Sequence, residues 1–135
     1  MTEAIGSYQS VATYLHLGAG GTAVPLEVDE EFWSKLTSGG FDHLGPGRLF
    51  SAYDFNADWT SWERHPAGEE VVVLLSGALE FVLELDDAER RVELSQPGQF
   101  LLVPRGAWHT ANVAQQARAL FITPGEGTEH RPRSR

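Results

Sequence analysis

Short apolar runs separated by turn residues follow one another from Arg48 almost to the end of the chain. Within the runs, side chains alternate between apolar and polar or are apolar throughout, as in strands that are half or fully buried. Glycine, proline, aspartate and serine stand between the runs and mark turns. The pattern predicts strands at 48–56, 59–65, 70–75, 78–85, 90–94, 99–104, 107–113 and 117–123. Short strands at this spacing indicate an all-β sandwich or barrel.

Residues before this region are richer in glycine and more weakly patterned. One segment, 28–37, is expected to form a short helix. Asp29 stands where an N-cap residue would be, and Phe32, Trp33 and Leu36 follow at helical spacing. The pattern therefore predicts a mostly β protein with one helical turn or two near its start.

We interpret the chain as one domain in three parts. Residues 1–46 form an N-terminal arm that packs on the barrel, 47–124 form the barrel, and 125–135 form a polar tail, which is expected to be a solvated end. Within the arm, Ser10–Leu17 is extended and apolar at alternate positions. Because an unpaired edge of this kind tends to be covered, we expect a homodimer in which N-terminal strands or tryptophan-bearing faces pack together.

The composition excludes several classes of protein. With 135 residues, 41% of them hydrophobic and 21% charged, the chain can bury a core of its own. A net charge of −9 disfavours a nucleic acid partner. The sequence has no apolar run long enough to span a membrane and no cysteine, which excludes disulfides and thiolate metal sites. Together with a start that lacks the pattern of a signal peptide, this favours a cytoplasmic protein.

The first stretch with candidate chemistry surrounds the turn Pro66-Ala67-Gly68. Glu63 and His65 are separated by one residue on a predicted strand, so both side chains point to one face. The returning strand opens with Glu69 and Glu70, and one of these two must share that face. A carboxylate at the start of so apolar a strand is costly to bury unless it is paired or binds a metal.

The second stretch contains a strand that ends at Pro104, a turn at Gly106, and His109 near the start of the next strand. A single histidine in such a place is usually a hydrogen-bonded core residue. Its combination with Glu63, His65 and a glutamate of the first stretch makes it a candidate ligand.

The first stretch resembles the first motif of the cupin family, in which a His-x-His pair precedes a glutamate and a glycine closes the motif. His65 takes the second histidine position, Glu70 the glutamate position and Gly77 the closing glycine. This spacing favours Glu70 as the inward-facing residue and places Glu69 in solvent, unless the turn is longer than assumed. Glu63 departs from the pattern, because it stands where the first histidine is usual.

The second stretch resembles the second cupin motif, G-x5-P-x-G-x2-H followed by Asn. Gly98, Pro104, Gly106 and His109 match it without a gap, and Asn112 falls one residue early. With the strands around both motifs, the resemblance extends from about 48 to 123. It implies an antiparallel jelly-roll β-barrel that holds a metal ion inside, and many members of the family are dimers.

The resemblance implies a ligand set of Glu63, His65, Glu70 and His109 for one divalent ion, Fe, Mn, Ni or Zn. The alternative is a metal-free pocket in which Glu63 forms a hydrogen bond to one of the two histidines. The other histidines are weaker candidates, and among them the best substitute for a third imidazole is His43; the remaining two are His16 and His130.

Three functions are compatible with these residues. The first is a metal-dependent enzyme of dioxygenase or isomerase type that acts on a small organic molecule, with Glu63 or Glu70 as a possible base. The second is a non-catalytic sensor of a metal or small molecule, resembling the cupin domains attached to anti-sigma factors. The third is a metal-free assembly module. Trp62 and Trp108, next to candidate ligands in the sequence, are expected to face away from the site.

Overall fold

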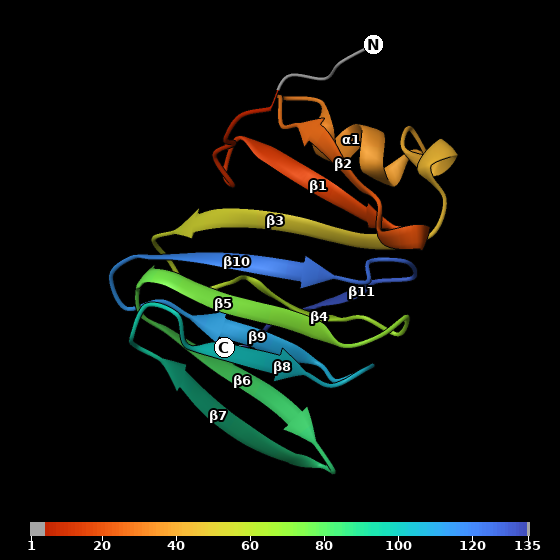
Figure 1. The fold of residues 1–135 in the computed structure, drawn as a ribbon. Helices are drawn as coiled ribbons and strands as arrows, with labels where there is room; N and C mark the ends of the chain where they lie inside the picture. The colour runs from red at the N-terminus through yellow and green to blue at the C-terminus, as the bar shows by residue number, and fades with distance from the viewer. Residues whose placement is uncertain (1–4, 135) are drawn as a thin grey trace.

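Two antiparallel sheets make up most of the computed structural model, which describes residues 5–134 (Figure 1). The strands are β1 (Thr13–Gly18), β2 (Ala23–Glu27), β3 (Gly47–Phe55), β4 (Ser61–Arg64), β5 (Glu70–Gly77), β6 (Leu79–Leu85), β7 (Ala88–Leu94), β8 (Phe100–Val103), β9 (His109–Asn112), β10 (Ala117–Thr123) and β11 (Glu129–Pro132). The helical segments are α1 (Phe32–Thr37) and two 3-10 turns, η1 (Ala19–Gly21) and η2 (Asp42–Leu44). In the part of the chain that is described, no helix is long and apolar enough to cross a membrane.

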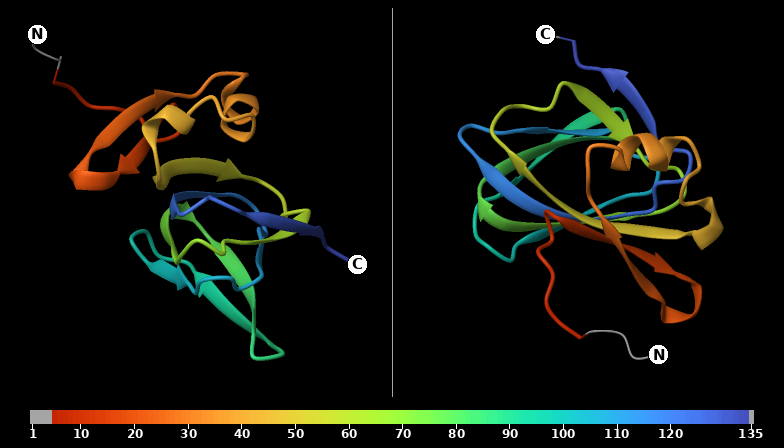
Figure 2. Two further views of the ribbon diagram at one scale, coloured as in Figure 1. Left: turned by 90° about the vertical axis from the view of Figure 1, so that its right-hand side faces the viewer. Right: turned by 90° about the horizontal axis from the view of Figure 1, so that it is seen from above.

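The strands between β3 and β10 are shared between the two sheets in the manner of a jelly roll. One sheet has the order β2-β1-β3-β10-β5-β8, and the other has the order β11-β4-β9-β6-β7. Seen from above, the strands surround a common interior (Figure 2). The all-β fold class predicted from the sequence is therefore confirmed, including its antiparallel jelly-roll arrangement.

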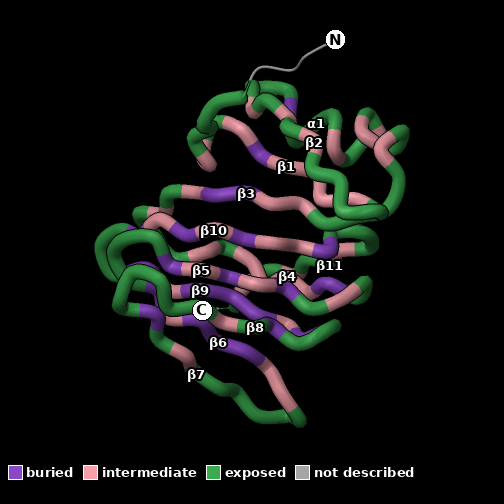
Figure 3. Tube along the Cα trace, in the orientation of Figure 1, coloured by how far each residue is buried: buried purple, intermediate pink, exposed green. Residues whose placement is uncertain are grey.

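Burial alternates along the central strands, although the stretch 71–75 is apolar throughout. In β5, Val72 and Leu74 are fully buried while their neighbours are partly exposed, and β10 follows the same rule with Ala119 and Phe121 (Figure 3). These side chains meet Phe81 and other residues of the second sheet in one core cluster. The interior is therefore filled mainly by apolar side chains contributed from both sheets.

The predicted strands of the barrel are all present, with small differences at their ends. β10 has the predicted bounds, and β3 is displaced by one residue. β9 begins only at His109, because the Ala107 N–H donates a hydrogen bond to the Pro104 carbonyl in the preceding turn. The candidate ligand His109 thus lies at the first position of its strand.

The N-terminal region extends a sheet. β1 pairs with β3 on one side and with β2 on the other. Ser10–Leu17 therefore does not leave the unpaired edge from which a homodimer was expected. The helix begins at Phe32, later than predicted. Asp29 is not its N-cap: its carboxylate accepts a hydrogen bond from the Glu31 N–H in the turn before the helix.

The polar tail is mostly exposed, as expected, but part of it is ordered as a strand. Residues 129–132 form β11, which pairs with β4. Arg131 forms an ion pair with Glu84 of β6, and its guanidinium carbon lies 4.6 Å and 5.0 Å from the ring centroids of Trp108 and Trp62. Cation–π contacts and a cross-strand ion pair attach the tail to the second sheet, which the basic composition of the tail did not indicate.

Candidate metal centre

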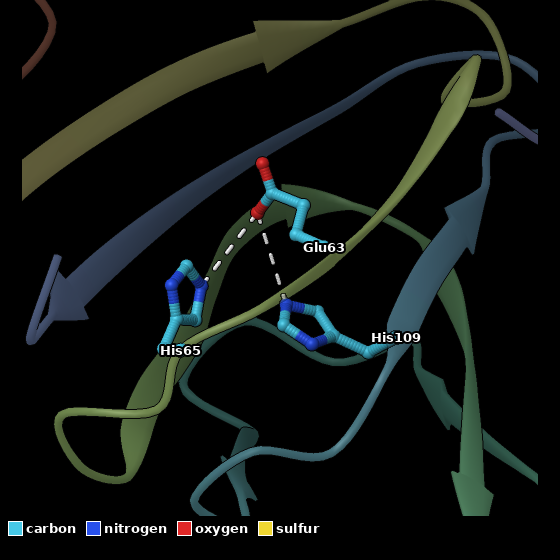
Figure 4. Close-up of side chains that lie close together, drawn as sticks. All are labelled: Glu63, His65 and His109. Carbon is cyan, nitrogen blue, oxygen red and sulfur yellow. Dashed lines mark ion pairs between the residues drawn. The ribbon is translucent and has the colours of Figure 1, made fainter. Parts of the chain in front are cut away.

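The structure brings together the four side chains that the sequence analysis selected. Glu63 lies on β4, His65 directly after it, Glu70 at the start of β5 and His109 at the start of β9. Glu63 and His109 face each other in the β4–β9 pair, and His65 shares the face of Glu63 because one residue separates them (Figure 4). The turn after His65 is fixed by its carbonyl, which accepts a hydrogen bond from the Gly106 N–H.

Distances among the four side chains suit a shared ion. The Nε2 atom of His109 lies 3.2 Å from Glu70 Oε1 and 3.8 Å from Glu63 Oε1, and the Nε2 atom of His65 lies 3.4 Å from Glu70 Oε2 and 3.7 Å from Glu63 Oε1. Ligand atoms held about 2 Å from one ion lie roughly 3 to 3.5 Å apart. Glu63, His65 and His109 each offer one atom within 4.8 Å of the others. This mutually close group does not include Glu70, which lies close to the two histidines but is not in the group with Glu63.

The hydrogen bond of His109 fixes its tautomer. Its Nδ1 lies 3.0 Å from the carbonyl oxygen of Ala107, which can only accept. Nδ1 therefore carries the proton, and in the neutral ring Nε2 has a lone pair that is directed toward the carboxylates. An imidazole held in this way by a backbone carbonyl is the usual form of a metal-binding histidine.

The hydrogen bond of His65 fixes its tautomer in the same way. Its Nδ1 lies 2.8 Å from the hydroxyl oxygen of Thr128, and that hydroxyl donates its only proton to the carbonyl of Gly125 at 2.7 Å. The hydroxyl must therefore accept a hydrogen bond from Nδ1–H. Neutral His65, like His109, then presents an unprotonated Nε2 to the centre.

Each carboxylate also has one oxygen held by a neighbouring side chain. The Thr123 hydroxyl donates to Glu70 Oε2 at 2.6 Å, and His130 Nε2 lies 3.2 Å from Glu63 Oε2. The other oxygen of Glu63, Oε1, faces both imidazoles, whereas Glu70 directs Oε1 to His109 and Oε2 to His65. Thr123, Thr128 and His130 thus orient three of the four candidate ligands.

Electrostatics at the centre favour a charged Glu70. Burial of this side chain opposes ionisation, but the neighbouring imidazoles of His109 and His65 prevail and hold the pKa of Glu70 at about 2. Burial likewise opposes protonation of His109, and the facing carboxylate of Glu70 outweighs it, so the pKa of His109 is raised. The centre is therefore a place where a positive charge is stabilised, whether it is a proton or a metal ion.

The fit of the residues to a metal can be tested on buried polar atoms. Nε2 of His65, Nε2 of His109 and Oε1 of Glu70 are all buried without a hydrogen-bond partner. Two lone pairs and an anionic oxygen that face one another repel unless a cation lies between them. An ion bound by these atoms would satisfy all three, so the residues present fit a divalent metal ion.

Burial separates the two adjacent glutamates as expected. Glu70 is 3% exposed and Glu69 is exposed, which confirms the orientation inferred from the spacing to Gly77. His43 lies exposed on η2 and makes no hydrogen bond or ion pair with the centre, so it is not the substitute imidazole. The histidine nearest the four is His130.

The sequence did not indicate that Thr123, Thr128 and His130 orient the ligands, and only His130 was named, as a weaker candidate for a third imidazole. Thr128 and His130 are more than sixty residues from their partners in the chain and come close only because β11 pairs with β4. The composition of the segment that contains Thr128 and His130 did not indicate this contact, because a polar segment near a chain end usually indicates solvent exposure. The rings of Trp62 and Trp108 contact the guanidinium of Arg131, in accord with their expected direction away from the site.

Comparison with known proteins identifies the fold. No family model and no curated protein sequence matches the chain. Three similar solved structures are oxalate oxidase (18% identity, 60% of this chain and 44% of that chain, TM-score 0.50), Peruvianin-I from Thevetia peruviana latex (18%, 65% and 58%, TM-score 0.53) and a cupin-2 domain protein from Shewanella frigidimarina (19%, 64% and 71%, TM-score 0.44). The chain spans about half the length of the first two.

At this level of identity the likeness concerns the fold and not the activity. Peruvianin-I is described as a cysteine peptidase, and the present sequence contains no cysteine. Oxalate oxidase is a cupin-fold protein, and the jelly-roll strand order of the present chain agrees with that fold. The chain has the fold of the cupin superfamily.

Proposed function

We propose that the barrel binds one divalent metal ion through Glu63, His65, Glu70 and His109, and that the ion binds and activates a small organic molecule. The observation that carries this proposal is the convergence of three buried polar atoms without partners, from both histidines and Glu70. The tautomers of the two histidines also support the proposal, because both rings direct a lone pair to the same point. The donor set suits Fe(II), Mn(II), Ni(II) and Zn(II).

The reaction we propose is of dioxygenase or isomerase type. A bound ion supplies Lewis acidity or, for iron and manganese, a redox centre. Glu63 is the candidate base, because its side chain is 27% exposed while those of His65, Glu70 and His109 are 5% exposed or less. The oxidase among the structural neighbours acts, by its name, on a small organic acid, and it supports chemistry on small molecules in a barrel of this fold.

The proposal is tested by elemental analysis of protein purified without added metal. We expect close to one ion per chain, and a sharp loss of metal in His65→Ala and His109→Ala with an unchanged far-ultraviolet circular dichroism spectrum. His43→Ala is the matched control, because it removes an exposed imidazole outside the centre. Equal metal content in all four proteins would refute the assignment of these ligands.

One observation favours a second candidate, a non-catalytic sensor. Three of the four candidate ligands are almost completely buried, and among the four only Glu63 is partly exposed to solvent. Four protein ligands can also close the coordination of an ion, as in structural sites, whereas a catalytic ion keeps one position open. A ligand-dependent change of assembly without turnover of any compound in a panel of small organic molecules would favour the sensor over the enzyme.

We further propose a homodimer, now on a different surface from the N-terminal edge. Phe100 and Leu102 of edge strand β8 are 62% and 53% exposed, and large apolar side chains on an edge strand are usually covered.

The cytoplasmic location stays a prediction, supported by the absence of cysteine.

A further inference from the structure

The candidate metal centre contains two carboxylates and no cationic side chain of lysine or arginine. In the described part of the chain, the ion pairs of Glu63 and Glu70 are formed with histidines alone. The hydrogen-bonding pattern of His65 and His109 makes both rings neutral ligands when an ion is bound. The charges that surround the ion therefore come from the two glutamates.

Arginines on the neighbouring strands are engaged elsewhere. Arg64 pairs with Glu129, and Arg131 pairs with Glu84. Arg133 donates hydrogen bonds to backbone carbonyl oxygens of the β3–β4 loop and β9 and to a side-chain amide. None of them is placed to compensate a negative charge brought to the centre.

With a divalent ion bound, the charges of the ion and the two carboxylates sum to zero. Glu63 is the most exposed of the four side chains, so it is the one of them that a small molecule from solvent would meet. A neutral centre offers an anion no net attraction that would offset the loss of its hydration in a partly desolvated place beside this carboxylate. An uncharged molecule meets no such barrier.

We infer that Glu63 makes the loaded centre electrically neutral and thereby selects uncharged small molecules over anions such as carboxylates. This inference rests on the proposed metal site and names the class of ligand that the site accepts. It also gives a physical role to the residue by which the chain departs from the first cupin motif. A neutral histidine at this position would leave one positive charge on the centre, and an anion would then be favoured.

The test uses Co(II)-loaded full-length protein and two small probes, azide as the anion and imidazole as the neutral ligand. Binding is followed by the visible absorption of Co(II) at pH 8, where exposed histidine side chains are uncharged. We expect azide to bind Glu63→Gln and Glu63→His at least about tenfold more tightly than the parent, because one negative charge has been removed from beside the ligand. Imidazole affinity should change much less.

Glu69→Gln is the matched control, because it removes the same charge from an exposed side chain that faces away from the centre. Its azide affinity should equal that of the parent. Equal azide affinity in the parent and Glu63→Gln, or no azide binding by any variant, would overturn the inference. Metal content is measured on each sample, so a parent that fails to hold Co(II) refutes the metal site itself and is distinguished from a failure of ligand selection.

Discussion

Each of the four candidate ligands uses one atom to keep its position and another to face the centre. His109 donates to a backbone carbonyl, His65 donates to Thr128, and Glu70 accepts from Thr123. This division decides the tautomers, the orientation of the carboxylates and the shifted pKa values together. At the residue scale, therefore, the centre is prepared for a cation before one binds.

The charge of Glu70 predicts the acid behaviour of the metal-free protein. Its pKa is about 2 in the folded protein against an ordinary value of 4.5, so ionised Glu70 stabilises the fold above pH 4.5 and this stabilisation is lost as the pH falls toward 2. Between pH 5 and pH 3 the parent should lose on the order of 2 kcal/mol more than Glu70→Gln. Urea unfolding in the presence of a chelator measures the difference.

The control for this experiment is Glu69→Gln, which removes an exposed carboxylate at the adjacent position. Its free energy of unfolding should follow the parent across the same pH range. If Glu70→Gln and Glu69→Gln have the same pH dependence, then Glu70 is not held in its charged form by the two imidazoles.

At the scale of elements, β11 is the strand that completes the centre. It pairs with β4, and His130 stands opposite Glu63 while Thr128 precedes the strand and holds His65. Losing the Thr128 hydroxyl removes the acceptor that fixes the His65 ring. Since partners of this kind typically contribute about 10- to 100-fold to metal affinity, Thr128→Val should weaken metal binding by about tenfold or more in a chelator competition.

Thr22→Val provides the comparison. The Thr22 hydroxyl donates to a carbonyl three residues earlier, as the Thr128 hydroxyl does, but it lies at the exposed end of η1. It should leave metal affinity unchanged. An equal effect of both variants would show that the loss arises from weakened local turns and not from His65.

The closing glycine of the first motif has a physical explanation in the turn after β5. Gly77 has a φ of 76°, and a Cβ atom there would lie 2.1 Å from the carbonyl oxygen of Gln116. Gly98 has a φ of 94° with open space around it. Gly98→Ala should therefore cost only the backbone term, about 1 to 2 kcal/mol, and Gly77→Ala clearly more, as measured by chemical unfolding. Equal losses would mean that the turn relaxes around the added methyl group.

These elements also show how far the sequence could predict the structure. The strands β5 and β10 were predicted from local sequence patterns, and the inward orientation of Glu70 was predicted from the motif's spacing to Gly77. The pairing of β11 with β4 depends on contacts between segments far apart in the chain, which leave no periodic signal in a short polar segment. Prediction therefore reached the four candidate ligands and missed the residues that orient them.

At the scale of the whole molecule, a negatively charged chain has an exposed apolar region on its first sheet. The chain has a net charge of −9, yet Val71 and Val73 lie beside the exposed Leu102 and Phe100 in the β5–β8 pair. Paired residues of neighbouring strands share a face, so these side chains form a continuous apolar strip on the outside of the first sheet. A surface of this kind lets acidic copies of one chain approach with little repulsion.

The dimer prediction can be tested on this strip. We expect the parent to be a dimer by light scattering at micromolar concentration, and Phe100→Ser/Leu102→Ser to be a monomer, because the double variant removes the two most exposed apolar side chains of β8. Trp33→Ser, which alters an exposed aromatic residue on α1, is the control and should remain a dimer. Metal content and circular dichroism should be the same in all three proteins, since neither substituted surface includes a candidate ligand. A monomeric parent would refute the homodimer. A dimer that survives the β8 substitutions but dissociates in Trp33→Ser would place the interface on the N-terminal segment, as the sequence first suggested.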